Sequence, residues 1–141
     1  MQTISTTDLA NRLRPVVTRL SRRMRQEAGG ELSPTQSAAL HTIDCHGPLT
    51  PSELATRERI QRPTATRTLA RLEEAGLITR TADPTDRRST LIATSPAGHA
   101  LIDTFRQRKD AYLATRLERL APDDLAALDR AAGILERVLG E

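Results

Sequence analysis

The 141-residue chain contains almost no aromatic side chains: one Tyr, one Phe and no Trp. Proteins that read single-stranded nucleic acids commonly stack the bases on aromatic rings, so this class is disfavoured, and any core must be packed from Leu, Ala and Ile. No apolar run approaches the ~20 residues that cross a bilayer. The first residues also lack the layout of a secretory signal, so we expect no membrane partner.

Cysteine is nearly absent as well. The single residue, Cys45, cannot form an intramolecular disulfide, which favours the reducing cytoplasm as its setting. We interpret Cys45 as a buried thiol that acts as a small hydrophobic side chain, and a redox role stays open. His41 shares its helical face, but a zinc site needs further ligands and no His/Cys cluster exists. Phosphate-binding glycine loops and nucleophile elbows are also missing, so nothing indicates an enzyme, a metal or a cofactor.

Positive charge is modest in total but unevenly distributed. The chain has 21 basic and 18 acidic residues, a net charge of +3, and Lys109 is its only lysine. Residues 1–30 carry six Arg against two acids, residues 50–90 eight Arg against six, and residues 96–141 seven basic against eight acidic residues. The positive excess therefore lies in the first two regions, and arginine is the residue that binds phosphates and guanine edges bidentately.

The prolines predict where helices begin. A proline at the first helical position has no amide that needs a partner, and five of the eight prolines predict helix starts near residues 34, 51, 63, 96 and 122. The segments Ser33–Gln36 and Thr50–Glu53 both have the pattern of a capping box. Pro48 and Pro84 fall in predicted loops, whereas Pro15 lies inside a helical stretch that it should kink.

Apolar spacing completes this pattern. Leucines at helical intervals predict helices over about 7–28, 51–58, 63–75, 96–120 and 122–139. Residues 77–94 contain two short Thr/Ile-rich runs around a Pro/Asp loop, which indicates a β-hairpin. We therefore predict a single, mainly α domain: a winged helix-turn-helix with a small β-hairpin wing (about 32–95) between N- and C-terminal dimerisation helices (about 7–28 and 96–139).

The helix predicted over about 63–75 is the second of the helix-turn-helix, and it would enter the major groove of double-stranded DNA. Ala65, Leu69, Leu72 and Leu77 are expected to face inward at helical spacing. The side chains left for the other face are Arg62, Thr64, Thr66, Arg67, Thr68 and Arg71. We expect Thr64, Thr66 and Arg67 to read bases and Arg62 and Arg71 to bind phosphates, with Ser52 of the preceding helix as a further DNA contact. The alternative is an ordinary solvated amphipathic helix.

The hairpin places Arg87 and Arg88 beside a projecting turn with acidic neighbours. Either arginine could insert into the minor groove, where narrow A/T-rich stretches attract guanidinium groups. The alternative is a surface turn with a local Asp–Arg pair.

The passages RLEEAGLITR and DPTDRR…AGHAL, within residues 32–101, resemble the MarR (multiple antibiotic resistance regulator) family of bacterial transcription factors. Two departures are visible: Arg62 stands where the recognition helix often has a small capping residue, and Thr94 replaces the usual strand leucine. The resemblance implies a homodimer joined by its terminal helices and an inverted-repeat operator. Family members generally bind effectors in a cleft between the dimer helices and the winged domain. Here the ends of the first, second and fifth helices would supply an aliphatic, Arg-edged lining suited to a small anionic or phenolic effector.

The leucine stripes of the terminal helices agree with a dimer, since a small winged domain does not need them. The alternative is an intramolecular helix bundle, which would leave the long helix after the hairpin poorly covered. We hypothesise a cytoplasmic, homodimeric, sequence-specific DNA-binding transcriptional regulator that acts as a ligand-responsive repressor. The alternative is a winged-helix module that binds a protein and does not read DNA. The basic start of the second helix disfavours that alternative.

Overall fold

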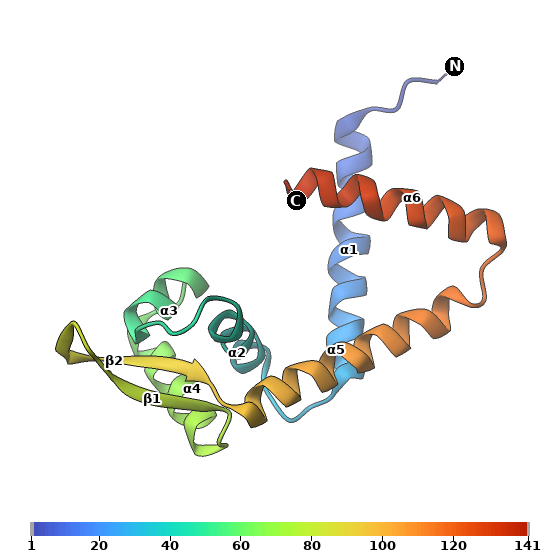
Figure 1. The fold of residues 1–141 in the computed structure, drawn as a ribbon. Coiled ribbons are helices and arrows are strands. Elements are labelled where there is room, and N and C mark those ends of the chain that lie inside the picture. The colour runs from blue at the N-terminus through green and yellow to red at the C-terminus, as the bar shows by residue number, and fades with distance from the viewer. Residues whose placement is uncertain (1, 141) are drawn as a thin grey trace. The chain divides into compact units, whose positions relative to one another are not determined.

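The computed structural model describes residues 2–140, which form six helices and one hairpin (Figure 1). Their order matches the predicted order, and the described part of the chain contains no helix long and apolar enough to span a membrane. The elements are α1 (Thr6–Ala28), α2 (Pro34–His46), α3 (Pro51–Glu58), α4 (Arg62–Glu74), β1 (Ile78–Asp83), β2 (Asp86–Thr94), α5 (Pro96–Leu117) and α6 (Pro122–Leu139).

These elements belong to two compact units. Residues 28–107 form the first, here called the winged unit, and residues up to 27 together with those from 108 onward form the second, the terminal-helix unit. Helix α5 contributes to both. The winged unit holds the predicted helix-turn-helix, so the candidate DNA contacts all lie within it.

The five helix starts predicted from prolines are confirmed to within one residue. Of the two predicted capping boxes, one forms completely and the other in part. At α2 the capping box is complete, because the Gln36 N–H donates to Ser33 Oγ at 3.1 Å and the Ser33 N–H donates to Gln36 Oε1 at 3.0 Å. At α3 only half of the predicted box forms: the Glu53 N–H donates to Thr50 Oγ1 at 3.2 Å. Pro15 lies inside α1 without ending that helix.

The core of the winged unit is aliphatic, as predicted from the scarcity of aromatics. The largest fully buried side chains come from α2, α3, α4, β2 and the loop before α3: Leu40, Ile43, Leu49, Leu54, Leu69, Leu72 and Ile92. Leu49 and Ile92 also exchange two backbone hydrogen bonds, at 3.0 and 2.8 Å. This antiparallel bridge attaches the loop before α3 to β2. Burial of these side chains is the main stabilising term, and it holds α4 rigidly against α2 and α3.

The hairpin is antiparallel, with Ile78 opposite Thr94 and Ala82 opposite Thr90. Ser95 lies at the base of the hairpin, between β2 and α5. Its hydroxyl donates to the carbonyl of Gly76, in the turn after α4, at 2.6 Å and accepts from the N–H of Gly98, in the first turn of α5, at 3.0 Å. A Cβ at Gly98 would overlap the Leu77 carbonyl oxygen, so this close approach of α5 to the hairpin requires glycine.

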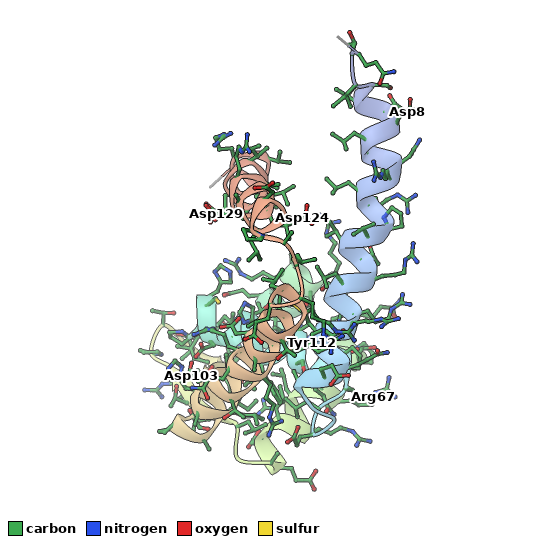
Figure 2. The ribbon with its side chains drawn as sticks, turned by 90° about the vertical axis from the view of Figure 1, so that its right-hand side faces the viewer. Asp8, Arg67, Asp103, Tyr112, Asp124 and Asp129 are labelled. Carbon is green, nitrogen blue, oxygen red and sulfur yellow. The ribbon has the colours of Figure 1, made fainter. Side chains whose placement is uncertain are left out.

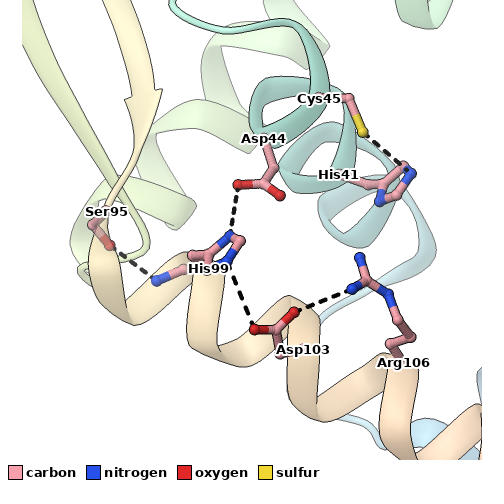
Figure 3. Close-up of polar contacts among 8 residues, drawn as sticks. His41, Asp44, Cys45, Ser95, His99, Asp103 and Arg106 are labelled. Carbon is pink, nitrogen blue, oxygen red and sulfur yellow. Dashed lines mark hydrogen bonds and ion pairs between the residues drawn. The ribbon is translucent and has the colours of Figure 1, made fainter.

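A polar network ties the start of α5 to α2 within the winged unit (Figure 3). His99 Nδ1 lies 3.2 Å from Asp44 Oδ1, and its Nε2 lies 3.6 Å from Asp103 Oδ2. Arg106 Nη1 in turn lies 3.3 Å from Asp103 Oδ1. These contacts add a polar link to the apolar packing between the two helices.

Cys45 differs from its predicted burial. The thiol is exposed on the outer face of α2, with Sγ 3.7 Å from His41 Nε2 (Figure 3). The shared helical face was predicted correctly, but the burial was wrong, because position 45 lies near the end of α2 and outside its buried side, which Ala39, Leu40 and Ile43 form. Within residues 2–140 no group of three or more metal-ligating side chains gathers anywhere.

Candidate nucleic-acid interface

Helix α4 presents two chemically distinct faces. Ala65, Leu69 and Leu72 are fully buried against the core, as predicted. The predicted outer-face position of Thr68 was wrong, because Thr68 is only 6% exposed and its hydroxyl donates to the Thr64 carbonyl at 2.8 Å. It lies between Ala65 and Leu72 on the buried stripe, where a small side chain with its own backbone partner is tolerated. The exposed residues of α4 are Arg62, Pro63, Thr66, Arg67, Ala70 and Arg71 along most of its length and Glu73 and Glu74 at its end, with Thr64 half-buried.

The first turn of α4 has no side-chain cap. Arg62 is the first helical residue, and Gln61 at the N-cap makes no capping hydrogen bond. Because no side chain caps this turn, its free N–H groups remain available to an anion such as a phosphate. Pro63, the next residue, has no N–H to offer. The arginine at this position thus coincides with an uncapped, positively polarised helix end.

Arg62 is held in place by the preceding helix. Its Nη1 donates a 2.6 Å hydrogen bond to Ser52 Oγ, which comes from the first turn of α3. The structure therefore brings together two residues that the sequence predicted separately. Ser52 also lines an open depression of about 520 Å³ with Glu53, Thr56 and Arg57.

Thr66 has a defined hydrogen-bonding capacity. Its hydroxyl hydrogen is committed to the Arg62 carbonyl at 3.0 Å, so only the oxygen lone pairs and the methyl group remain available. These groups suit the amino groups of adenine or cytosine and the methyl group of thymine. Arg67, one position further, is exposed and extends from the same helix (Figure 2).

The wing carries Arg87 and Arg88 at the start of β2, directly after the turn, and both are exposed. The hairpin register shifts beside this segment, between Ala82 and Asp83, so the regular alternation of strand side chains does not apply to Arg87 and Arg88. The two arginines differ instead in their hydrogen-bond partners. Asp86 Oδ1 accepts from the Arg88 N–H at 3.0 Å and lies 3.5 Å from Arg88 Nε. The predicted acidic neighbour therefore braces Arg88.

The turn itself is closed by Asp83. Its Oδ1 accepts from the Thr85 N–H at 2.9 Å and from the Thr85 hydroxyl at 2.8 Å. These two hydrogen bonds favour the ionised carboxylate and lower the pKa of Asp83 below its usual value.

Sequence reasoning missed two positions in the turn between α3 and α4. Gln61 is exposed, and its position before Arg62–Pro63 could have identified it as an N-cap. Arg59 is also exposed and has a left-handed backbone, with φ 54° and ψ 43°. No sequence signal marks Arg59, because glycine or asparagine normally occupies that conformation.

The fold and this exposed face define a winged helix-turn-helix protein of the DNA-binding class. Residues 32–90 match the MarR family. An HTH-type transcriptional regulator of Mycobacterium tuberculosis is 34% identical over 134 residues, which cover 94% of this chain and 94% of that protein. The multiple antibiotic resistance protein MarR of Salmonella typhimurium is 31% identical, over 89% of this chain and 93% of that protein. The chain belongs to the MarR family of DNA-binding transcriptional regulators and is not an enzyme.

Solved structures agree. A transcriptional regulator from Pseudomonas aeruginosa is 34% identical and superposes with a TM-score of 0.83 over 96% of this chain and 98% of that chain. A mutant of MepR from S. aureus, bound to an oligodeoxyribonucleotide, has the same fold, with a TM-score of 0.72, 20% identity and coverage of 97% and 99%.

Proposed function

We propose that the protein is a cytoplasmic, homodimeric, ligand-responsive repressor that binds an inverted-repeat operator. The observation that carries the DNA contact is the exposed face of α4, which a fully buried aliphatic stripe anchors to the core. Thr64, Thr66 and Arg67 read bases, and Arg62 and Arg71 bind phosphates, with Ser52 positioning Arg62. One of Arg87 and Arg88 enters the minor groove.

A gel shift on the protein's own promoter region tests DNA reading. We expect a retarded band that weakens steeply as salt rises, because phosphate contacts release condensed counterions. A competitor duplex of unrelated sequence should displace the protein far less well than the promoter does. Absence of any shift at low salt would contradict DNA reading and favour the alternative, a winged-helix module that binds a protein.

Exposed apolar side chains support the dimer. Five residues of α1 are between 36% and 53% exposed: Leu9, Leu13, Val16, Val17 and Leu20. On α6, Leu125, Leu128, Ile134, Val138 and Leu139 are exposed as well. A stable water-soluble chain rarely leaves two such faces in water, and a second copy of the chain would bury both.

Light scattering after size exclusion tests the dimer. The wild type should elute at twice the chain mass, and Leu13→Asp should shift it towards the monomer because a carboxylate would be buried in the interface. Thr18→Asp, on an exposed part of the same helix, is the matched control and should remain dimeric. A wild-type monomer at micromolar concentration would contradict this part of the proposal.

A hollow within the terminal-helix unit supports a ligand response. It has a volume of about 340 Å³ and lies between the end of α1 and the C-terminal half of α5, lined by Glu27, Arg108, Ala111, Tyr112, Thr115 and Arg116. The Arg116 guanidinium carbon is 5.1 Å from the centre of the Tyr112 ring. Tyr112 can be located on α5 in Figure 2. Cations beside an aromatic ring suit a small anionic phenol.

Calorimetric titration with hydroxybenzoates tests this effector class. We expect binding that is weakened by Arg116→Ala and that lowers operator affinity in the gel shift. Absence of binding heat from a protein that still binds its operator normally would remove this effector class and leave the DNA contact intact.

A further inference from the structure

The helix-turn-helix turn contains an arginine where the backbone favours glycine. Arg59 has φ 54° and ψ 43°, and it is the only non-glycine with positive φ among residues 2–140. The Cβ of an L-residue crowds the following carbonyl in this conformation, so glycine, and to a lesser degree asparagine, is favoured there. A long charged side chain at such a position needs an explanation.

The hydrogen bonds around Arg59 show that the motif itself is a regular helix end. The Arg59 N–H donates to the Thr56 carbonyl at 3.3 Å, and the Ile60 N–H donates to the Ala55 carbonyl at 3.0 Å. This pair of bonds is the Schellman motif, whose left-handed residue is usually glycine.

The same chain closes α4 with the same motif and uses glycine there. The Gly76 N–H donates to the Glu73 carbonyl at 2.9 Å, and the Leu77 N–H donates to the Leu72 carbonyl at 2.9 Å, with Gly76 at φ 75°. Two equivalent helix ends therefore differ in one residue. The end of α4 follows the backbone preference, and the end of α3 violates it.

Nothing within the winged unit explains the exception. Arg59 is exposed, and no hydrogen bond or ion pair joins its guanidinium to any residue in the part of the chain that the structure describes. The neighbouring carboxylate, Glu58, is engaged by the Thr42 hydroxyl of α2. Arg57 and Arg62 lie on either side in sequence, so the turn carries a surplus of positive charge.

We propose that Arg59 is a phosphate-binding residue, and that the unfavourable backbone conformation is retained because its side chain contacts the DNA backbone. This inference rests on the proposed DNA reading by α4. In a helix-turn-helix the first helix crosses the phosphate backbone and the second enters the groove, so the turn between them lies beside phosphates. The contact carries no sequence information and adds affinity for every duplex.

The experiment compares Arg59→Gly with the wild type on a duplex of about 30 bp from the promoter region and on an unrelated duplex of equal length. Arg59→Gly should raise the midpoint of thermal unfolding by about 3 °C, because the backbone strain is relieved. Its affinity should nevertheless fall about tenfold on both duplexes. The slope of log affinity against log salt should become shallower by about 0.9 for each phosphate that the variant no longer neutralises.

Three further variants serve as controls. Arg59→Lys keeps the charge and should retain most of the salt slope, and Arg59→Asn supplies a second left-handed-compatible residue if Arg59→Gly is poorly expressed. Arg119→Ala, in the exposed turn after α5, removes one charge elsewhere and should leave both affinity and slope unchanged.

The outcomes separate the two proposals. If Arg59→Gly binds both duplexes with wild-type affinity and slope, the phosphate contact is overturned while DNA reading stands. If the wild type binds neither duplex, DNA reading fails and the Arg59 contact fails with it.

Discussion

Arg62 Nη1 donates a 2.6 Å hydrogen bond to Ser52 Oγ, and this bond joins the first turn of α4 to the first turn of α3. Both side chains are exposed, so the bond is open to water and contributes little to folding stability. Its consequence concerns binding: a guanidinium already held by a hydroxyl loses less conformational freedom when it meets a phosphate.

A double-mutant cycle tests this positioning. Arg62→Ala should weaken operator binding by about 1–3 kcal/mol, and Ser52→Ala by about 0.5–1 kcal/mol. Because Ser52 acts through Arg62, the double variant should be no weaker than Arg62→Ala alone. Fluorescence anisotropy with labelled operator measures all four affinities. Fully additive losses would show that Ser52 binds DNA independently of Arg62.

Two exposed arginines of α4 should differ in kind. Arg67→Ala should relax sequence preference at one operator position, costing about 1–3 kcal/mol on the preferred base pair only. Arg71→Ala should weaken all duplexes alike and make the salt dependence shallower. Binding to a library of single-base operator variants distinguishes the two patterns. If neither substitution changes operator affinity, α4 is not the recognition helix.

The two wing arginines are also distinguishable. Asp86 partly neutralises Arg88, whereas no acidic side chain within residues 2–140 forms an ion pair with Arg87. Arg87→Ala should therefore reduce affinity for operators with A/T-rich flanks by more than Arg88→Ala does. Anisotropy on A/T-rich and G/C-rich flanks gives the comparison. Equal losses from both substitutions would contradict a wing contact made mainly by Arg87.

Thr94 offers a gain of stability. Its hydroxyl oxygen is buried without a hydrogen-bond partner among the described residues, at the base of the hairpin opposite Ile78. Thr94→Val replaces the hydroxyl with a methyl group of similar size and should stabilise the fold by about 1 kcal/mol. Thr79→Val, on the exposed side of β1, is the control and should change stability by less than about 0.5 kcal/mol. Thermal unfolding reports both; a lower midpoint for Thr94→Val would show that the hydroxyl is satisfied in solution.

The turn of the wing should respond to acid. The pKa of Asp83 is lowered by the N–H and hydroxyl of Thr85, so the ionised carboxylate stabilises the folded turn. That contribution is present above the unfolded value of about 3.8 and is lost as pH falls through the lower folded pKa. Thr85→Ala removes the hydroxyl and should move the pKa upward towards its usual value. An NMR titration of the Asp83 side chain measures the shift, and an unchanged pKa would contradict a role for that hydroxyl.

Features that depend on neighbours in sequence were predicted well. The capping box at Ser33, the proline starts and the hairpin around Pro84 involve groups only a few residues apart, so the same contacts form wherever the segment lies. The buried stripe of α4 followed from helical spacing for the same reason, and only Thr68 was misplaced. A threonine beside a stripe can lie on either face, and packing against α2 and α3 decides which.

The sequence by itself determined an aliphatic winged helix-turn-helix with an arginine-rich α4. It did so through the scarcity of aromatics, the positions of the prolines and the spacing of the leucines. Tertiary structure decided three further points: Cys45 is exposed, Ser52 holds Arg62, and Arg59 closes α3 in a left-handed conformation. Each of these depends on what lies next to a residue in space, or on a backbone angle that the residue type opposes. Local preferences therefore place the elements, and the packing between the elements determines which side chains are left free to meet DNA.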